Sequence, residues 1–216
     1  MEDRELLEQW RKVLRLKIGG EVILFDGKGN EASAKIANLD RNFGEVEILG
    51  VSKNKNEPQR HVVLYCSILK RENFELVAQK ATEVGVSEIV PIVAARTEKF
   101  NLRTDRLSRV VKEAAEQSGR ASLPSLHPSV EFLRALAAAK ANDVNLFSDP
   151  SGRNFRDFRF APSDRRFGVW VGPEGGWTEE EVSLARTEGL EIIGLGPLTL
   201  RAETAAIVAT YLTTNY

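Results

Sequence analysis

From residue 61 to the end of the sequence, short apolar runs alternate with segments of helical periodicity, and this alternation constrains the fold more than any other feature. Strands are expected at 61–69, 87–93, 144–147, 167–171 and 191–195, and helices at 71–84, 104–118, 129–140, before 188 and at the end of the sequence. In Thr104–Ser118 the apolar residues fall on one helical face, and Gly119 supplies a C-terminal stop. Strands that alternate with helices are typical of a mostly parallel sheet with helical crossovers, so an α/β domain is predicted.

The first 49 residues have a different pattern. The apolar runs EVILF, EASAKIANL and EVEIL are separated by the turn sequences DGKGN and DRNFG, so β-hairpins are expected. The stretch SKNKNEPQR at Ser52–Arg60 is polar and contains a proline, which favours a linker. We therefore predict a domain boundary there, with a small β domain at residues 1–60 and the α/β domain at residues 61–216.

Composition and charge exclude several classes of protein. With 42% hydrophobic residues in 216 and a net charge of -1, the chain resembles neither a disordered nor a strongly basic protein. Any affinity for nucleic acid must therefore come from local patches. Residues 171–216 hold two basic and seven acidic residues, whereas the earlier part holds 28 basic and 24 acidic. A site for a polyanion is expected before residue 171.

The single cysteine, Cys66, lies in the apolar run HVVLYCSIL, which indicates a small buried side chain and excludes an internal disulfide. No apolar run reaches the length of a membrane span, and the first residues, MEDRELLEQW, do not form the hydrophobic region of a signal peptide. We expect a soluble protein of the cytoplasm with no membrane partner.

The stretch VGPEGGWTEEEV contains three glycines directly after a predicted strand and before a predicted helix. Glycines at such a point let backbone amides approach a ligand. The loop has neither the GK[ST] of a P-loop nor the spacing of a dinucleotide fingerprint, and Glu174 disfavours phosphate, so a cationic or neutral ligand is expected. Helix initiation alone, through a Thr178–Glu181 capping box and a Trp177–Val182 staple, accounts for the second half of the stretch but not for the glycines.

A second loop, in LGPLTLRAETAAIVAT, follows the next predicted strand and brings Arg201, Glu203 and Thr204 to the start of a helix. Loops at the C-terminal ends of parallel strands converge on one crevice, so the two loops are expected to form one pocket. Beyond them, alanines at 202, 205, 206 and 209 make a narrow face of small residues. Packing within the chain and contact with a second subunit both remain open for this face.

VGPEGGWTEEEV and LGPLTLRAETAA, preceded by FELVAQKATEVGVSEIVP and EAAEQSGR, closely resemble motifs of the RsmE family of bacterial small-subunit rRNA uracil-N3 methyltransferases. VLRLKIGGEVILFDGKG is similar to the family's N-terminal domain, so the resemblance covers most of the chain. It implies a PUA-like β-barrel followed by a SPOUT domain whose C-terminal segment forms a trefoil knot, one of the rare exceptions to unknotted chains. It also implies a homodimer formed through the knotted domains.

The resemblance implies that the two glycine loops wrap S-adenosylmethionine, whose sulfonium charge agrees with the argument from Glu174. The residues that it assigns to the cofactor are Phe147, Val171, Gly172, Glu174, Gly175, Gly176, Leu195, Gly196, Leu198, Leu200, Ala202 and Thr204. The implied reaction is methylation of N3 of one uridine in 16S rRNA, either free or in the small subunit. This chemistry requires no metal and no cysteine nucleophile, a task for which Cys66 would be a poor candidate.

Arg201 is the expected neighbour of the reacting base, because a guanidinium stabilises negative charge on a uracil carbonyl. Glu203 is a candidate proton acceptor, but capping the helix or pairing with Arg201 is an equal alternative, and the general base is left open. Residues predicted to face RNA are Arg96, Gln117 and Arg120 at the rim and Arg11, Lys12, Arg15 and Lys17 in the PUA-like part. A solvated surface is the alternative for each of these residues.

The sequence departs from the family pattern at several positions. Leu198 stands near the Gly-Pro of the second loop where the family usually has an arginine, Glu8-Gln9 replaces a His-His pair, and the family's first basic strand is expected to be missing. These departures predict weaker or shifted RNA binding, and they leave the glycine loops intact. Two alternatives remain: a SPOUT methyltransferase that acts on another RNA site, and a non-catalytic RNA-binding factor in ribosome assembly. His61 and His127 are assigned no role.

Overall fold

The computed structural model describes residues 1–98 and 101–216, which divide into two compact units. The first unit comprises residues 1–57 together with 120–122, and the second comprises residues 58–119 together with 123–216. Each unit has its own sheet, and each is described by itself.

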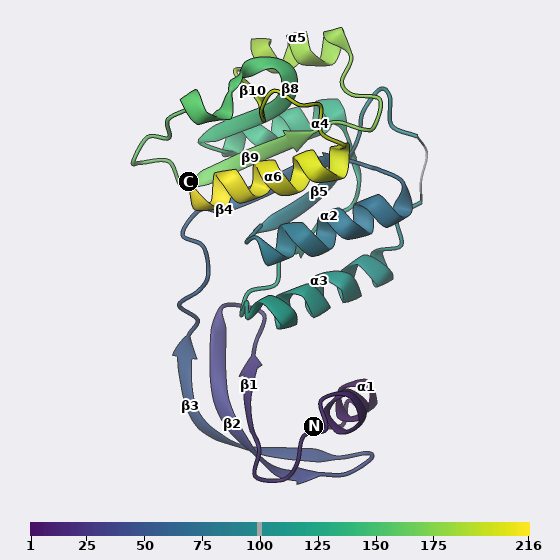
Figure 1. The fold of residues 1–216 in the computed structure, drawn as a ribbon, viewed down its shortest axis with the longest axis vertical. Coiled ribbons are helices and arrows are strands. Elements are labelled where there is room, and N and C mark those ends of the chain that lie inside the picture. The colour runs from purple at the N-terminus through teal and green to yellow at the C-terminus, as the bar shows by residue number, and fades with distance from the viewer. Residues whose placement is uncertain (99–100) are drawn as a thin grey trace. The chain divides into compact units, whose positions relative to one another are not determined.

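The first unit contains an antiparallel sheet of three strands in the order β1-β2-β3, formed by β1 (Glu21–Phe25), β2 (Asn30–Leu39) and β3 (Gly44–Lys53) (Figure 1). The predicted hairpins are confirmed. In the first turn the carboxylate of Asp26 accepts hydrogen bonds from the amides of Lys28 at 2.7 Å and Asn30 at 3.1 Å. The described strands form an open sheet rather than the closed barrel that was expected, because β1 and β3 each pair with β2 and not with one another.

The beginning of the chain is helical. Helix α1 (Arg4–Glu8) begins at Asp3, whose side chain accepts from the amides of Glu5 and Leu6, and it continues into a π-helical turn at Gln9–Val13. Leu7 and Trp10 are buried on this segment. The first element of this unit is therefore helical, and Leu7 and Trp10 form its buried apolar side.

The segment 120–122 belongs to the first unit because it binds Glu57. The Glu57 carboxylate accepts hydrogen bonds from the amides of Ala121 and Ser122, both at 2.9 Å. It also forms an ion pair with the guanidinium of Arg120 at 3.0 Å. The stretch that was predicted to be a linker thus begins inside β3, which runs to Lys53, and contains an anchored glutamate.

The second unit is built on a parallel sheet, as the alternation of strands and helices predicts. Its strands are β4 (His61–Ser67), β5 (Glu88–Val93), β6 (Ser125–Leu126), β7 (Val130–Glu131), β8 (Val144–Asn154), β9 (Arg166–Val171) and β10 (Glu191–Gly194). The order is β10-β8-β9-β4-β5-β6, with β7 also paired to β5, and every one of these pairings is parallel. The loops after β8, β9 and β10 therefore lie at one edge.

Helices cover both faces of this sheet. They are α2 (Arg71–Glu83), α3 (Thr104–Ser118), α4 (Phe132–Ala138), α5 (Glu179–Thr187) and α6 (Ala202–Asn215), with short 3-10 turns at Ala139–Ala141 and Phe155–Asp157. Alternate residues of β4 face different cores: Leu64 packs with residues of α2, α3 and α6, and Tyr65 packs with residues of α4 and α5. Figure 1 shows α6, α2 and α3 along one face of the sheet. Helix α3 has the predicted bounds, and Gly119 ends it at φ 71°.

Strand β8 is longer than the sequence indicated. It was expected at residues 144–147 but extends to Asn154, because its second half pairs with β10 after a register shift between Ile192 and Ile193. Gly152 makes this approach possible, since a Cβ there would lie 2.5 Å from the backbone of Ile192.

At the opposite edge of the sheet one carboxylate joins several strands. Glu88 on β5 accepts hydrogen bonds from His61 at 2.6 Å, from His127 at 2.7 Å and from Arg166 on β9 at 2.8 Å. Burial opposes ionisation of Glu88, but these three bonds outweigh it, so the pKa of Glu88 is lowered. The two histidines thus contribute to the fold.

Two further expectations from composition concern burial and the membrane. Cys66 is fully buried on β4, and burial raises the pKa of its thiol, which agrees with an unreactive core residue. Over residues 1–98 and 101–216, none of the helices combines the length and the apolar character needed to cross a membrane.

Candidate active site

A cavity of about 600 Å³ lies at the C-terminal ends of β9 and β10 and beside residues 148–150 of β8 in the second unit. Its walls come from both glycine loops and from the first turns of α2 and α6. The two loops therefore share one pocket, as the geometry of a parallel sheet predicts. The predicted cofactor residues that line it are Val171, Gly172, Glu174, Gly175, Gly176, Leu195, Gly196, Leu198, Leu200 and Ala202.

The fold accounts for two of the three glycines in the first loop. Gly176 has φ 69°, a backbone conformation that favours glycine, and its amide donates to the carbonyl of Pro173 at 2.8 Å. A Cβ at Gly172 would lie 3.0 Å from the ring of Trp177, so a side chain there would displace the indole and glycine is favoured. At Gly175 a Cβ would make only ordinary contacts, at 3.5 Å from Arg96. Packing does not explain Gly175, so the close approach of a ligand stays the prediction for this position.

Trp177 is a packing residue at the base of this loop. Its ring stacks on Phe147 at 4.4 Å between centroids, and its Nε1 donates to the carbonyl of Ser148 at 3.0 Å. The capping box predicted from the sequence is present: Glu181 binds the amide of Thr178 at 2.9 Å, and Thr178 binds the amide of Glu181 at 3.2 Å. Phe147 is fully buried behind Trp177 and is not among the residues that line the cavity, so the structure gives it a supporting position.

Arg96 holds the first loop from the side. Its Nη1 donates to the carbonyl oxygens of Gly175 at 2.8 Å and Trp177 at 3.2 Å. The neighbouring amide of Ala95 donates to Glu181 at 2.8 Å. The side chain predicted to face RNA is therefore engaged by the glycine loop, and an RNA contact for Arg96 stays a prediction.

Glu174 ties the loop to a second element. Its Oε1 accepts a hydrogen bond from the amide of Lys70, the residue immediately before α2, at 3.1 Å. A carboxylate at a helix N-terminus satisfies an unpaired amide and interacts favourably with the helix dipole. Glu174 thus has a structural partner as well as the position at the cavity wall that the sequence argument used.

Arg201 and Glu203 both line the cavity at the start of α6. Arg201 occupies the N-cap position and is exposed, whereas Glu203 is only 9% exposed. Among the described residues neither side chain has an ion pair within 4.0 Å, and the side chain of Arg201 makes no capping hydrogen bond. The Glu203–Arg201 pair left open by the sequence is not formed here. Thr204 is exposed and is not among the lining residues.

Several lining residues were missed by sequence reasoning: Lys70, Asn73, Ser148 and Asp149. Ser148 is the most informative of them. Its hydroxyl oxygen is buried and has no hydrogen-bond partner within the described part of the chain. A buried hydroxyl without a partner is costly, so this atom is available to a ligand in the cavity. Only the position of Ser148 directly after a predicted strand could have indicated it.

The other predicted RNA-facing residues lie on both units. In the first unit Arg11, Lys12, Arg15 and Lys17 are exposed, and Lys12 is paired with Glu8 at 2.9 Å. In the second unit Gln117 is exposed on α3. Arg120 is not on an exposed rim: it is 7% exposed, and Glu57 binds its guanidinium. Glu57 therefore gives Arg120 a structural task, and an RNA contact for this residue has no support from its geometry.

A family model described as an RNA methyltransferase domain matches residues 55–214, and another described as an RNA methyltransferase PUA domain matches residues 11–49. Fold, site and these matches together define an RNA methyltransferase of the α/β class with a PUA domain. The chain is 32% identical over 177 residues to ribosomal RNA small subunit methyltransferase E of Mesomycoplasma hyopneumoniae, covering 80% of this chain and 77% of the relative. For the protein of the same name from Rickettsia conorii, identity is 30% over 203 residues, covering 92% and 82%.

Solved structures agree with this assignment. Ribosomal RNA small subunit methyltransferase E from Neisseria gonorrhoeae, bound to S-adenosyl methionine, superposes with a TM-score of 0.88 at 32% identity, covering 97% of this chain and 89% of the other. A methyltransferase from Legionella pneumophila, in complex with the same cofactor, gives 0.86 at 29% identity, covering 96% and 88%. The chain belongs to the ribosomal RNA small subunit methyltransferase E family.

Proposed function

We propose that this protein transfers the methyl group of S-adenosylmethionine to N3 of one uridine in 16S rRNA. The observation that carries the proposal is the cavity at the sheet edge, where two glycine loops meet beside Arg201 and Glu203. Both side chains face this cavity without an ion-pair partner in the described residues, which leaves them available to a substrate. Membership of the family supports the substrate class.

The cavity suits the proposed cofactor. A volume of about 600 Å³ lies in the range of small-molecule sites, and Val171, Leu195 and Ala205 give it apolar walls. The unpartnered hydroxyl of Ser148 offers a hydrogen bond, and Gly175 allows close backbone approach. When bound, S-adenosylmethionine supplies an electrophilic methyl group on a sulfonium centre. Glu174 and Asp149 at the wall make the site more favourable for positive charge than for phosphate.

The residues of the chain supply the remaining chemistry. Uracil N3 carries a proton, so methylation requires removal of that proton and stabilisation of the imide charge that develops on the carbonyl oxygens. Glu203 is the proposed proton acceptor because its carboxylate lines the cavity and Arg201 does not neutralise it. Arg201 donates to a uracil carbonyl and stabilises the developing charge. The start of α6 brings both residues to the wall of the same cavity, where the reacting base would be held.

The two units have different tasks in this proposal. We assign RNA binding to residues 1–60 and methyl transfer to residues 61–216, in a protein that works in the cytoplasm, where it meets the ribosomal RNA. We further propose that residues 195–216 form the trefoil knot of the SPOUT class. The return of the chain from β10 at the sheet edge to α6, which packs on β4 and β9, supports this proposal.

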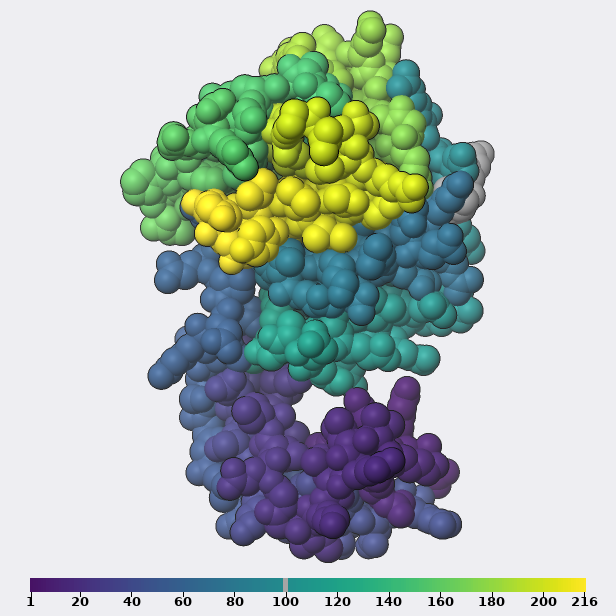
Figure 2. All heavy atoms as spheres, in the orientation of Figure 1, coloured from purple at the N-terminus to yellow at the C-terminus, as the bar shows by residue number. Residues whose placement is uncertain are grey.

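We also propose a homodimer through the knotted region. Figure 2 shows α6, in yellow, at the surface of the second unit, and Tyr211 on this helix is 46% exposed. Ala202, Ala206 and Ala209 pack into the core of the chain, so only the outer side of α6 is available to a partner. Sedimentation of the purified protein tests the dimer: a single species of monomer mass at micromolar concentration would contradict it.

The test of the proposed function is methyl transfer from labelled S-adenosylmethionine to small ribosomal subunits that lack the modification, followed by digestion to nucleosides and mass spectrometry. We expect 3-methyluridine from the natural chain and a loss of at least about 100-fold for Arg201→Ala, the typical effect of removing one donor to a developing charge. Cofactor binding without 3-methyluridine would favour a different RNA site. Failure to bind the cofactor would favour the non-catalytic assembly factor.

A further inference from the structure

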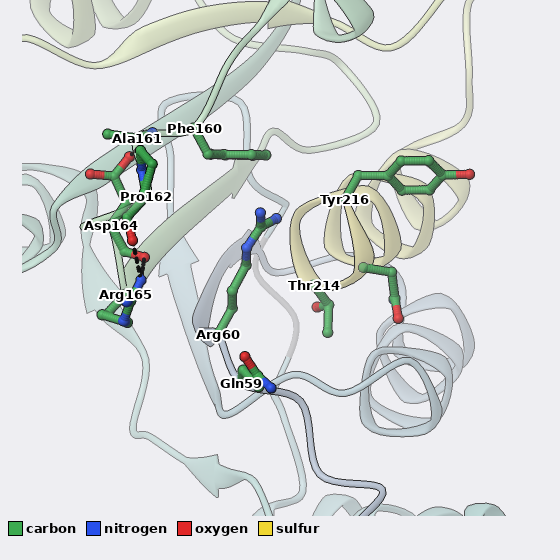
Figure 3. A pocket seen from close by; sticks show the side chains of 10 residues that line it. Gln59, Arg60, Phe160, Ala161, Pro162, Asp164, Arg165, Thr214 and Tyr216 are labelled. Carbon is green, nitrogen blue, oxygen red and sulfur yellow. Dashed lines mark hydrogen bonds between the residues drawn. The ribbon is translucent and has the colours of Figure 1, made fainter.

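A second cavity in the second unit, of about 640 Å³, lies away from the glycine loops. It is formed by the residues that precede β4, the segment that precedes β9 and the last turn of α6. Figure 3 shows the side chains of Arg60 and Arg165 within it, with Phe160 and Tyr216 nearby. Because β4 and β9 begin here, this cavity is at the opposite edge of the parallel sheet from the methyl-transfer site.

Arg60 is held in a fixed orientation in this cavity. Its guanidinium carbon lies 4.4 Å from the ring centroid of Phe160 and 5.3 Å from that of Phe167, so the cation lies over two aromatic rings. Its Nη1 donates to the carbonyl of Thr213 at 2.8 Å. Within the described residues it has no carboxylate within 4.0 Å, and several of its N–H donors remain available.

Arg165 is held by backbone carbonyls, and it has no ion pair within 4.0 Å among the described residues, although the carboxylate of Asp143 interacts with its charge. Its Nη1 donates to the carbonyls of Pro162 at 2.6 Å and of Asp164 at 2.9 Å, and the side chain is exposed. Asp143 fixes the backbone at this point, since its carboxylate accepts from the amides of Arg165 and Arg166, both at 2.8 Å. The segment thus presents a guanidinium whose charge is not neutralised by an ion pair.

Two basic residues, Arg60 and Arg165, and one acidic residue, Asp164, line the cavity. The segment 153–166 contains five arginines and two aspartates. Arg153 and Arg166 form ion pairs with glutamates, but in the part of the chain that is described Arg156, Arg159 and Arg165 form none. Asp164 lines the cavity, and its carboxylate accepts from the amide of Ala161 at 2.7 Å. The four arginines without an ion pair, three in this segment and Arg60, outnumber Asp157, Asp164 and the neighbouring Asp143, so an anionic partner is favoured.

We propose that Arg60 and Arg165 form a binding site for the phosphodiester backbone of the RNA substrate. This inference rests on the proposed function, which supplies the RNA. Guanidinium groups bind phosphate oxygens through two parallel N–H donors, and the contact with the Phe160 ring holds Arg60 ready for that geometry. A strand of the length of β4 spans about 20 Å, so the site contacts nucleotides distant from the reacting base. It positions the RNA and does not select the base.

The test uses the full chain and a 16S rRNA transcript, with binding measured at several salt concentrations. Each phosphate contact contributes about 0.7 to 0.9 to the slope of log affinity against log salt. We expect Arg60→Ala and Arg165→Ala each to reduce the steepness of this slope by the amount that roughly one phosphate contact contributes. Each variant should also bind the RNA several-fold more weakly, with cofactor affinity unchanged. Arg186→Ala is the matched control, because Arg186 is an exposed arginine of the same unit on α5.

Three outcomes would overturn the inference. The first is an Arg165→Ala protein with the natural slope and affinity; this variant is decisive because Arg165 is exposed, whereas loss of Arg60 also removes packing. The second is a loss of RNA affinity in Arg60→Ala and Arg165→Ala that is no larger than the loss in the control variant Arg186→Ala. The third is unchanged RNA binding with a changed sedimentation mass, which would make this face a contact between copies of the chain. Methyl transfer by the natural chain, assayed in parallel, separates these results from failure of the proposed function itself.

Discussion

Removal of the Arg96 side chain tests whether this residue serves the cofactor loop or the RNA. Arg96 donates from one nitrogen to the carbonyls of Gly175 and Trp177, and no other described side chain donates to these two oxygens. A hydrogen bond from a charged donor contributes about 1.5–3 kcal/mol. Arg96 is exposed, and its bond to Gly175 lies in solvent, which screens the interaction. The two hydrogen bonds together therefore contribute about 1–2 kcal/mol to the stability of the loop.

If the loop must adopt this shape to bind the cofactor, that free energy appears in the cofactor affinity. Arg96→Ala is therefore expected to raise the dissociation constant of S-adenosylmethionine roughly 5- to 30-fold at 25 °C. Titration calorimetry measures this change, and Arg103→Ala is the control, since Arg103 is an exposed arginine paired only with Asp105. Arg96→Lys keeps the charge and is expected to lie between the natural chain and Arg96→Ala. Unchanged cofactor affinity together with weaker RNA binding would refute this reasoning and support the contact predicted from the sequence.

Two further predictions follow from single groups. Ser148→Ala should weaken cofactor binding several-fold in calorimetry while the melting temperature stays the same or rises, because the buried hydroxyl has no protein partner among the described residues; unchanged affinity would remove Ser148 from the site. Glu88 has a pKa below its ordinary value of 4.5, so it stabilises the fold above that pH and loses this contribution as the pH falls through the lowered pKa. Glu88→Gln should therefore lower the melting temperature at pH 7 and flatten its decline below about pH 4.5; an unaltered acid limb of the melting curve would contradict the linkage.

The sequence predicted the elements whose cause is local. Helix α3 could be bounded because its apolar spacing and Gly119 are written in adjacent residues, and the capping box of α5 for the same reason. The long β8 could not be predicted, since DPSGRN has the composition of a turn and becomes a strand only when β10 pairs with it. The open sheet of the first unit also differs from the barrel that the resemblance implied.

In the site, too, features with a local cause could be predicted from the sequence and features that depend on distant contacts could not. The glycine loops and their common pocket were predictable from motif order and from the geometry of a parallel sheet. The burial of Arg120 was not, because its partner Glu57 lies 63 positions earlier. Ser148 could not be recognised either, since the absence of a partner for its hydroxyl is a property of the packed structure.

The glycine motif defines where a ligand can approach, but residues outside it define the shape of the loop. Arg96 binds the loop across 79 positions, the amide of Lys70 binds Glu174 across 104, and Trp177 is fixed to β8 through the carbonyl of Ser148. Glycines lower the cost of many conformations equally, so they cannot select one of them. Selection requires these distant contacts. Cofactor affinity should therefore respond to substitutions at Arg96 that leave the motif itself intact.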